Sequence, residues 1–419
     1  MSIAWTSRYA LRAKDIKSSA IRELLKITQR PEVISFAGGL PANDVFPIER
    51  FEEACRKVLE QNAVMALQYG ETEGYKPLRD MIARHIARYG IKAQAENVLI
   101  TTGSQQALDL IGKLLVNSRD KVLVEAPTYL GALQAFDVYG AEYVSVPCDE
   151  QGLRTDLLEA HLRLRPKFMY VLPNFQNPGG ATLSEDRRHT LVALANKYGI
   201  PIVEDDPYGQ LRYEGEHLSP LVVLDRENVP NDASYTLGNV FYLSTFSKTL
   251  APGLRLGWIV APPDVIAKLV QLKQGADLHT STFAQVVAYE VARDNFLDEH
   301  VRKLRDIYRE RRDIMLAALA QYFPSEVRWT HPQGGLFLWM SLPEGMDAND
   351  LFHEALKHYV AFVPGNSFFA PSDQSQDGSR HLRLNFSHAR PDEIREGIRR
   401  LSTAVKTRLE QLPFVRRRS

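Results

Sequence analysis

The sequence predicts an α/β fold, in which a large domain holds a mostly parallel sheet of the seven-stranded type between helices and a smaller α+β domain follows. Three observations predict it. Short apolar runs alternate with helical stretches through the middle of the chain, each run ends in residues suited to ligand binding, and the alternation stops after about residue 310.

Composition limits the class of protein. The chain has 419 residues, enough for two or three domains, and 51 basic residues balance 51 acidic ones, which disfavours a nucleic-acid-binding or anionic-membrane-binding protein. Cys55 and Cys148 are too few for a disulfide framework or a four-cysteine zinc site, so we expect no metal. No apolar stretch is long enough for a targeting or membrane segment. We expect a cytoplasmic enzyme.

Five apolar runs are the predicted parallel strands. They span residues 98–101, 122–124, 168–172, 200–203 and 240–243. The chain then reaches, in the same order, Ser104 in a Gly-Ser turn, Tyr129, Asn177, Asp205 and Lys248. Turn chemistry explains each of these ends singly, but not a set that includes a tyrosine and a lysine. Ligands bind at the carboxyl ends of parallel strands, so we expect these residues to share one site.

Outside this block the pattern changes. Residues 335–339 and 382–386 read as strands between helices, without the parallel alternation. We therefore expect three parts: an N-terminal arm and helix that join the small domain, a large ligand-binding domain, and a C-terminal small domain. Their boundaries are 1–46, 47–309 and 310–419.

The segment from Thr245 to Gly257 is the strongest chemical signal. Lys248 at a strand end can condense with an aldehyde if its amine is neutral, which desolvation and nearby cations promote. Thr245 and Ser247 offer hydroxyls, and Arg255 offers a guanidinium suited to a phosphate. The hydroxyls, the lysine and the arginine around one Gly/Pro turn favour a site over a surface lysine.

This segment resembles the lysine motif of fold-type I pyridoxal-5′-phosphate (PLP) aminotransferases of class I/II. Further motifs, spread over nearly the whole chain, resemble the 2-aminoadipate aminotransferase (LysN-like) and kynurenine aminotransferase II group. These motifs occupy residues 21–25, 36–41, 67–70, 103–106, 127–129, 177–180, 204–208 and 382–386. Gly179 departs from the pattern, because many relatives have threonine there.

The resemblance implies a PLP cofactor bound covalently to Lys248. Asp205 is then expected against the pyridine nitrogen, where a carboxylate keeps that nitrogen protonated. Asn177 and Tyr208 are expected to hydrogen-bond the phenolic oxygen, and Tyr129 to stack on the ring. Taken alone, Asp205 and Asn177 would be turn residues and the two tyrosines core aromatics.

The phosphate of PLP is expected at a helix start. Ser104 and the backbone amides of Ser104 and Gln105 open a helix, which makes an anion site, although a plain N-cap explains Ser104 almost as well. Thr245, Ser247 and Arg255 complete the cofactor-binding set. Tyr69 matches a tyrosine that reaches the phosphate of a neighbouring subunit, which implies a homodimer with shared active sites; a surface tyrosine is the alternative.

Substrate contacts follow from a buried cation. Arg383 lies in an apolar strand and needs an anion, because an unpaired buried guanidinium costs several kcal/mol. The resemblance implies that Arg383 grips the substrate α-carboxylate, with Gly39 and Asn177 beside it. Ser19 and Arg22 match a helix that covers the substrate side chain, and Arg22 either pairs with a distal carboxylate or is a solvated arginine.

The resemblance thus implies an aminotransferase of the EC 2.6.1 class. By a ping-pong mechanism it would move an amino group from 2-aminoadipate, an aromatic or a branched-chain amino acid to 2-oxoglutarate. Another PLP reaction on the same fold, such as cysteine-conjugate β-lyase activity, is one alternative. The other is an aminotransferase-like regulator; the roughly 30 residues before Phe36 are too few for a DNA-binding module, and the chain carries no net charge.

Overall fold

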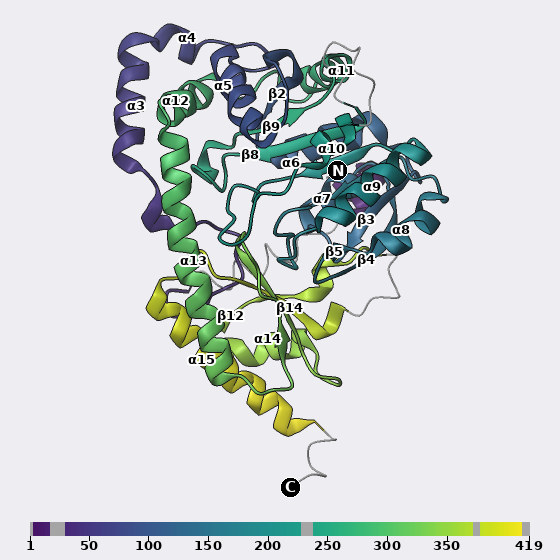
Figure 1. The fold of residues 1–419 in the computed structure, drawn as a ribbon, viewed down its shortest axis with the longest axis vertical. Helices are drawn as coiled ribbons and strands as arrows, with labels where there is room; N and C mark the ends of the chain where they lie inside the picture. Colours follow the sequence, from purple (N-terminus) through teal and green to yellow (C-terminus); the bar gives the residue numbers. More distant parts are fainter. Residues whose placement is uncertain (1–2, 17–29, 228–237, 372–377, 413–419) are drawn as a thin grey trace.

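The computed structural model describes residues 3–16, 30–227, 238–371 and 378–412. An eight-stranded mixed sheet occupies the upper part of the molecule in Figure 1. Its strand order is β2-β9-β8-β7-β6-β3-β4-β5. The strands are β2 (Val98–Thr101), β3 (Lys121–Ala126), β4 (Glu142–Asp149), β5 (Gly152–Leu153), β6 (Met169–Val171), β7 (Ile202–Asp205), β8 (Val240–Thr245) and β9 (Gly257–Val260).

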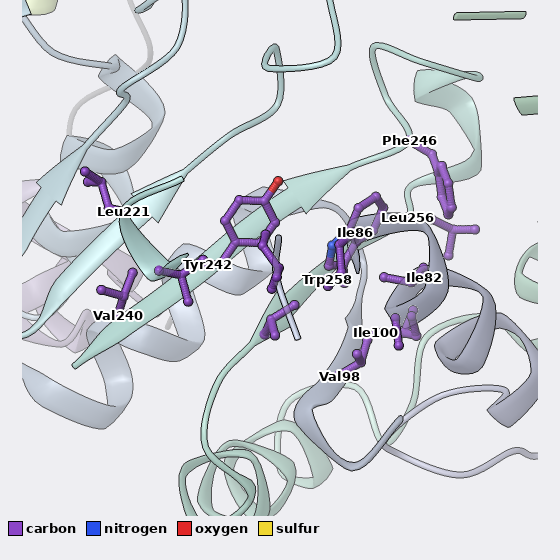
Figure 2. Packing of buried hydrophobic residues seen from close by; sticks show 14 of the residues in the cluster. Ile82, Ile86, Val98, Ile100, Leu221, Val240, Tyr242, Phe246, Leu256 and Trp258 are labelled. Atoms are coloured by element: carbon purple, nitrogen blue, oxygen red, sulfur yellow. The ribbon is translucent and has the colours of Figure 1, made fainter. Parts of the chain in front are cut away.

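Helices cover both faces of this sheet, which is why its central strands β6, β7 and β8 are buried along their whole length. In β8 the side chains alternate: Val240 and Tyr242 join one apolar cluster, and Phe241 and Leu243 join the other. Figure 2 shows Val240 and Tyr242 on the same side as Trp258 of β9. Because apolar clusters cover both faces of this strand, a ligand can approach it only at its carboxyl end.

The helices of this part comprise α-helices and short 3₁₀ segments. They are η2 (Asn43–Val45), α3 (Ile48–Gln61), α4 (Ala63–Leu67), α5 (Lys76–Ile86), η3 (Ala87–Tyr89), η4 (Ala95–Asn97), α6 (Ser104–Leu115), α7 (Leu130–Asp137), α8 (Thr155–Leu162), α9 (Glu185–Tyr198), α10 (Leu221–Glu227), η5 (Pro252–Leu254), α11 (Pro263–Gln274) and α12 (Thr282–Ala292). The clusters assign α6, α7 and α11 to one face of the sheet and α5, α8, α9, α10 and α12 to the other.

A second, smaller sheet is antiparallel, with the order β10-β11-β14-β13, and packs with the C-terminal helices (Figure 1). Its strands and the neighbouring elements are β10 (Arg328–Trp329), β11 (Phe337–Ser341), β13 (Val363–Pro364), β14 (His381–Asn385), α13 (Phe296–Tyr322), α14 (Ala348–Lys357), η6 (Gly365–Phe368), η7 (Gly378–Arg380) and α15 (Pro391–Gln411).

The N-terminal region adds a separate two-stranded sheet beside the C-terminal elements. Strand β1 (Ile34–Ser35) pairs in parallel with β12 (Val360–Ala361), and Phe36 enters the apolar cluster of the C-terminal elements. Further upstream lie η1 (Trp5–Arg8) and α1 (Leu11–Asp15). The chain therefore brings residues 36–40 to the junction between the two sheets.

The predicted fold class is confirmed, with differences in detail. The apolar runs near residues 98, 122, 168, 200 and 240 are all strands, and both predicted C-terminal strands form as β11 and β14. The sheet has eight strands rather than the seven of the predicted type. Strands β4, β5 and β9 were not predicted, and β9 runs antiparallel to both β2 and β8. Consequently β2 and β8 point the same way, and the five carboxyl ends still meet at one edge. Within the described residues, no helix is long and apolar enough to cross a membrane.

Candidate active site

A cavity of about 290 Å³ lies where the carboxyl ends of β2, β3, β6, β7 and β8 meet residues from the second sheet. Among the described residues, every predicted site residue except Tyr69 lines it. The lining is Gly39, Ser104, Gln105, Tyr129, Leu172, Asn177, Asp205, Pro207, Tyr208, Thr245, Ser247, Lys248, Pro252, Arg255, Phe337 and Arg383. A larger hollow of about 550 Å³ on the surface of α13 contains none of them.

Lys248 lies in the turn that follows β8, because Thr245 ends the strand and the chain reverses before β9. Its Nζ donates a hydrogen bond of 2.6 Å to the carbonyl oxygen of Gly39. Burial, reinforced by the cations Arg383 and Arg255, lowers the pKa of Lys248 to about 8. A substantial fraction of this amine is therefore neutral near pH 8, as a nucleophilic lysine requires.

Asp205 ends β7 and is buried. Its Oδ2 accepts a hydrogen bond of 2.8 Å from the Tyr170 hydroxyl, whereas its Oδ1 is buried without a partner. Burial and the neighbouring Asp206 raise the pKa of Asp205 to about 7, against the effect of Tyr170. A buried carboxylate with one free oxygen is suited to a ring N–H donor, because such a donor restores the charged form.

The anion-binding end of the cavity is the start of α6. Gly103 adopts a positive φ of 77° there, and a Cβ at this position would lie 2.7 Å from Nη2 of Arg255. The Arg255 guanidinium therefore packs directly on the turn that opens the helix. The Ser104 hydroxyl is buried without a partner beside it. Free helix amides, an unpartnered hydroxyl and a guanidinium form a suitable site for a phosphate.

Thr245 and Ser247 lie on the same side of the cavity, and their hydroxyl oxygens are 2.9 Å apart. Gln105 also lines the cavity, and its amide donates a 2.7 Å hydrogen bond to the carbonyl oxygen of Gly131. Gly257 opens β9, where a Cβ would lie 2.9 Å from the Ser104 nitrogen. Only glycine therefore allows the lysine segment to approach the α6 turn this closely.

Arg383 of β14 is buried, and no described carboxylate forms an ion pair with it. Nη1 donates to Asn177 Oδ1 and Nη2 to the carbonyl oxygen of Ala37, each at 2.7 Å, while Nε has no partner. The guanidinium lies between the rings of Phe337 and Phe368, at 4.2 and 5.0 Å from their centres. Burial lowers the pKa of Arg383 to about 10, against the effect of Tyr208 and Tyr129.

Two tyrosines complete the wall. Tyr129 follows β3 and Tyr208 follows β7, and burial is the main cause that raises the pKa of each. Both phenols therefore stay neutral hydrogen-bond donors. The Tyr208 ring meets Phe337 edge-on at 5.8 Å. Gly180, in the turn after Asn177, has a φ of 73°, and a Cβ there would lie 2.8 Å from the Phe337 carbonyl oxygen.

One described residue of the predicted site, Tyr69, does not line the cavity. Tyr69 is 77% exposed and lies against His279, with ring centres 5.8 Å apart. Arg22 and Ser19 lie outside the described residues. Conversely, sequence reasoning missed Phe337 and Tyr170. Phe337 sits in a recognised strand next to two glycines, and Tyr170 sits in a recognised apolar run, but nothing in either pattern indicates which face meets the site.

Nearly the whole chain is similar to known proteins. Residues 32–401 match the family "Aminotransferase class I and II". The chain is 45% identical over 410 residues to aromatic-amino-acid aminotransferase 1 of Thermococcus litoralis, covering 96% of this chain and 95% of that protein. It also resembles solved structures of two relatives.

One is LysN, an α-aminoadipate aminotransferase of Thermus thermophilus, solved in complex with N-(5′-phosphopyridoxyl)-L-leucine; it has 43% identity and a TM-score of 0.90, covering 98% of this chain and all of that one. The other is kynurenine aminotransferase of Pyrococcus horikoshii, solved with PMP; it has 42% identity and a TM-score of 0.90, covering 97% of this chain and 98% of that one.

Proposed function

The chain belongs to the aminotransferase class I and II family, and from that premise we propose that it carries PLP on Lys248 and exchanges an α-amino group between an amino acid and a 2-oxo acid. The observation that supports this most is the buried cavity in which one lysine amine, one free carboxylate oxygen and two cations converge. The relatives solved with phosphopyridoxyl and pyridoxamine groups support the same cofactor.

The buried polar atoms of the cavity that lack hydrogen-bond partners match the polar groups of PLP. Asp205 Oδ1 would accept from the pyridine N–H, and the Ser104 hydroxyl with Arg255 would hold the phosphate. Asn177 and Tyr208 would bind the phenolic oxygen, and Tyr129 would cover the ring. When bound, PLP supplies an electron-withdrawing ring that stabilises negative charge at the substrate Cα.

The protein contributes orientation and proton transfer. Arg383 would hold the substrate α-carboxylate, since its Nε is free and its charge has no described counterion. Lys248 Nζ, in its neutral form, would take the proton from the substrate Cα and later return it, as general base and acid. The carbonyl oxygen of Gly39 orients that amine.

Substitution of the lysine tests this function. Lys248→Ala should lower kcat by roughly 10⁴-fold, because it removes both the covalent anchor and the proton carrier. Lys268→Ala is the matched control, since Lys268 is exposed on α11 and its amine donates a hydrogen bond to Gln271. Turnover by Lys248→Ala within tenfold of the control would reject the assignment.

For substrates, we propose 2-aminoadipate, aromatic or branched-chain amino acids as donors and 2-oxoglutarate as acceptor. The support is the 2-aminoadipate, aromatic and kynurenine activities in the names of relatives. Arg22 is proposed to pair with the distal carboxylate of dicarboxylic substrates. A donor panel with Arg22→Ala should show a loss of about 1–3 kcal/mol for dicarboxylic substrates alone. Pyruvate and ammonia formed from a cysteine conjugate without any 2-oxo acid would instead favour the β-lyase alternative.

We also propose a homodimer with shared active sites. On α4 and the following turn, Val64, Leu67 and Tyr69 are 85%, 70% and 77% exposed, an unusual concentration of exposed apolar surface. A second copy that covers this surface would bury it and bring Tyr69 to the neighbouring phosphate site. Sedimentation that shows a fully active monomer would contradict this. The free thiols of Cys55 and Cys148 support the proposed cytoplasmic location.

A further inference from the structure

A fully buried lysine lies behind the phosphate end of the cavity and does not line it. Lys273, near the end of α11, has a side chain with no exposed surface. Its Nζ donates to Asp277 Oδ1 at 2.7 Å, to Asp277 Oδ2 at 2.8 Å and to Gln106 Oε1 at 2.8 Å. An ammonium group is rarely buried without a specific partner, because its desolvation costs several kcal/mol. Through Asp277 and Gln106, these hydrogen bonds connect Lys273 to Thr102.

Thr102 is the residue before the Gly103–Ser104 turn. Asp277 Oδ2 accepts from the Thr102 hydroxyl at 3.0 Å and from Gln106 Nε2 at 2.6 Å. Gln106 Oε1 in turn accepts from the Thr102 backbone nitrogen at 2.8 Å. The side chain of Thr102 is therefore bonded to Asp277 and its amide to Gln106. We call the four residues Thr102, Gln106, Lys273 and Asp277 the Lys273 clamp.

The clamp and the cavity meet the same turn at different residues. Ser104 and Gln105 line the cavity, whereas none of the four clamp residues does. A helix start binds an anion well only when its amides are fixed in advance, because ordering the turn would otherwise reduce the affinity. Lys273 also compensates the Asp277 carboxylate, whose charge behind the turn would oppose a phosphate.

We propose that Lys273 and Asp277 are positioning residues that fix the Thr102–Gly103–Ser104 turn for the phosphate group of the cofactor, an inference that rests on the proposed function of the cavity. The clamp should then matter for a ligand that carries the phosphate and not for the same ligand without it. PLP and pyridoxal form that pair of probes.

The test measures dissociation constants of PLP and of pyridoxal for the full chain freed of cofactor, by visible absorbance, with inorganic phosphate as a competitor. Lys273→Met should raise the dissociation constant of PLP about tenfold and weaken phosphate competition in parallel, while that of pyridoxal stays within a factor of about two. Lys273→Met combined with Asp277→Asn should recover part of the loss, because the uncompensated carboxylate is gone. Lys268→Met on the exposed face of α11 should change neither constant.

Two weaker variants keep the test open if Lys273→Met does not fold. Thr102→Val and Gln106→Leu each remove part of the clamp and should weaken PLP selectively, by a smaller factor. Equal losses for PLP and pyridoxal, or no loss for either, would overturn the inference. Failure of the unsubstituted chain to prefer PLP over pyridoxal would reject the proposed function itself, which is a separate outcome.

Discussion

Two buried arginines, Arg188 and Arg383, both bond to the loop of residues 173–183 and show how structural and ligand-binding sites differ in this molecule. Arg188 of α9 is fully buried and every nitrogen of its guanidinium donates: to the carbonyl oxygens of Leu183, Ser219 and Pro173, and to Asn174 Oδ1, at 2.6–3.0 Å. Arg383 is equally buried but leaves Nε unpartnered. The first is satisfied by the protein, and the second is not.

The polar groups near each arginine differ in the same way: those near Arg188 have partners within the protein, and several of those near Arg383 do not. Behind the loop, Asp206 accepts from Asn174, the Gly209 nitrogen and Tyr242, and Glu204 accepts from the first two nitrogens of α10. In the cavity, Asp205 Oδ1 and the Ser104 hydroxyl are buried without partners. Buried polar groups are nearly always bonded, so a cluster of free ones indicates where a ligand supplies the missing bonds.

Arg188→Leu should have the largest effect on stability. It leaves the buried carbonyl oxygens of Leu183, Ser219 and Pro173 without donors, and the free energy of unfolding should fall by about 3–5 kcal/mol. Denaturant titration measures this, with the exposed Arg163→Leu as a control that should change stability little. A loss below about 1 kcal/mol would mean that the satisfied network is not what stabilises this loop.

Arg383→Lys should show the opposite profile. The positive charge remains, but the planar guanidinium that can bond both oxygens of a carboxylate is lost. We therefore expect kcat/KM for α-amino acids to fall by about 100-fold, which corresponds to about 2–3 kcal/mol of transition-state stabilisation. Stability should change far less than for Arg188→Leu. A primary amine without a carboxylate is the matched substrate, and its kcat/KM should change little. Parallel losses for both substrates would remove the carboxylate role from Arg383.

The amine of Lys248 should make cofactor binding depend on pH. Burial, and after it the cations Arg383 and Arg255, lower the pKa of Lys248 to about 8, so the amine is mostly protonated and unreactive below pH 8 and mostly neutral above it. In the chain freed of cofactor, the rate of covalent PLP binding should rise about tenfold per pH unit up to a midpoint near 8 and then level off. Arg383→Met removes one cation and should move that midpoint upward. Stopped-flow absorbance gives both, and an unmoved midpoint would contradict the stated cause.

The sequence predicted the cavity well because its residues occupy one kind of position. Lys248, Asp205 and Tyr129 each follow an apolar run, and parallel strands bring such positions together irrespective of the loops between them. Arg383 was predicted for a different reason, because a cation inside an apolar strand needs a partner.

What the sequence did not predict depends on contacts between distant segments. Arg188 and Lys273 sit in helices in which most other charged residues are exposed, and nothing in their spacing indicates burial. Phe337 reaches the site through the pairing of β11 with β14, which places it opposite Asn385. Strand β9 begins at Gly257, the last residue of the lysine segment, and the sequence predicted no strand there.

The central claim is that the unpartnered groups of the cavity surround a cofactor joined to Lys248. Borohydride reduction of the PLP-loaded protein, followed by peptide mass mapping, tests it most directly, because reduction makes the lysine–cofactor bond permanent. The account predicts a single phosphopyridoxyl addition, on the peptide that contains Lys248, and none on the peptides that contain Lys268 or Lys273. An addition on another lysine, or a protein that binds PLP without any modified peptide, would contradict it.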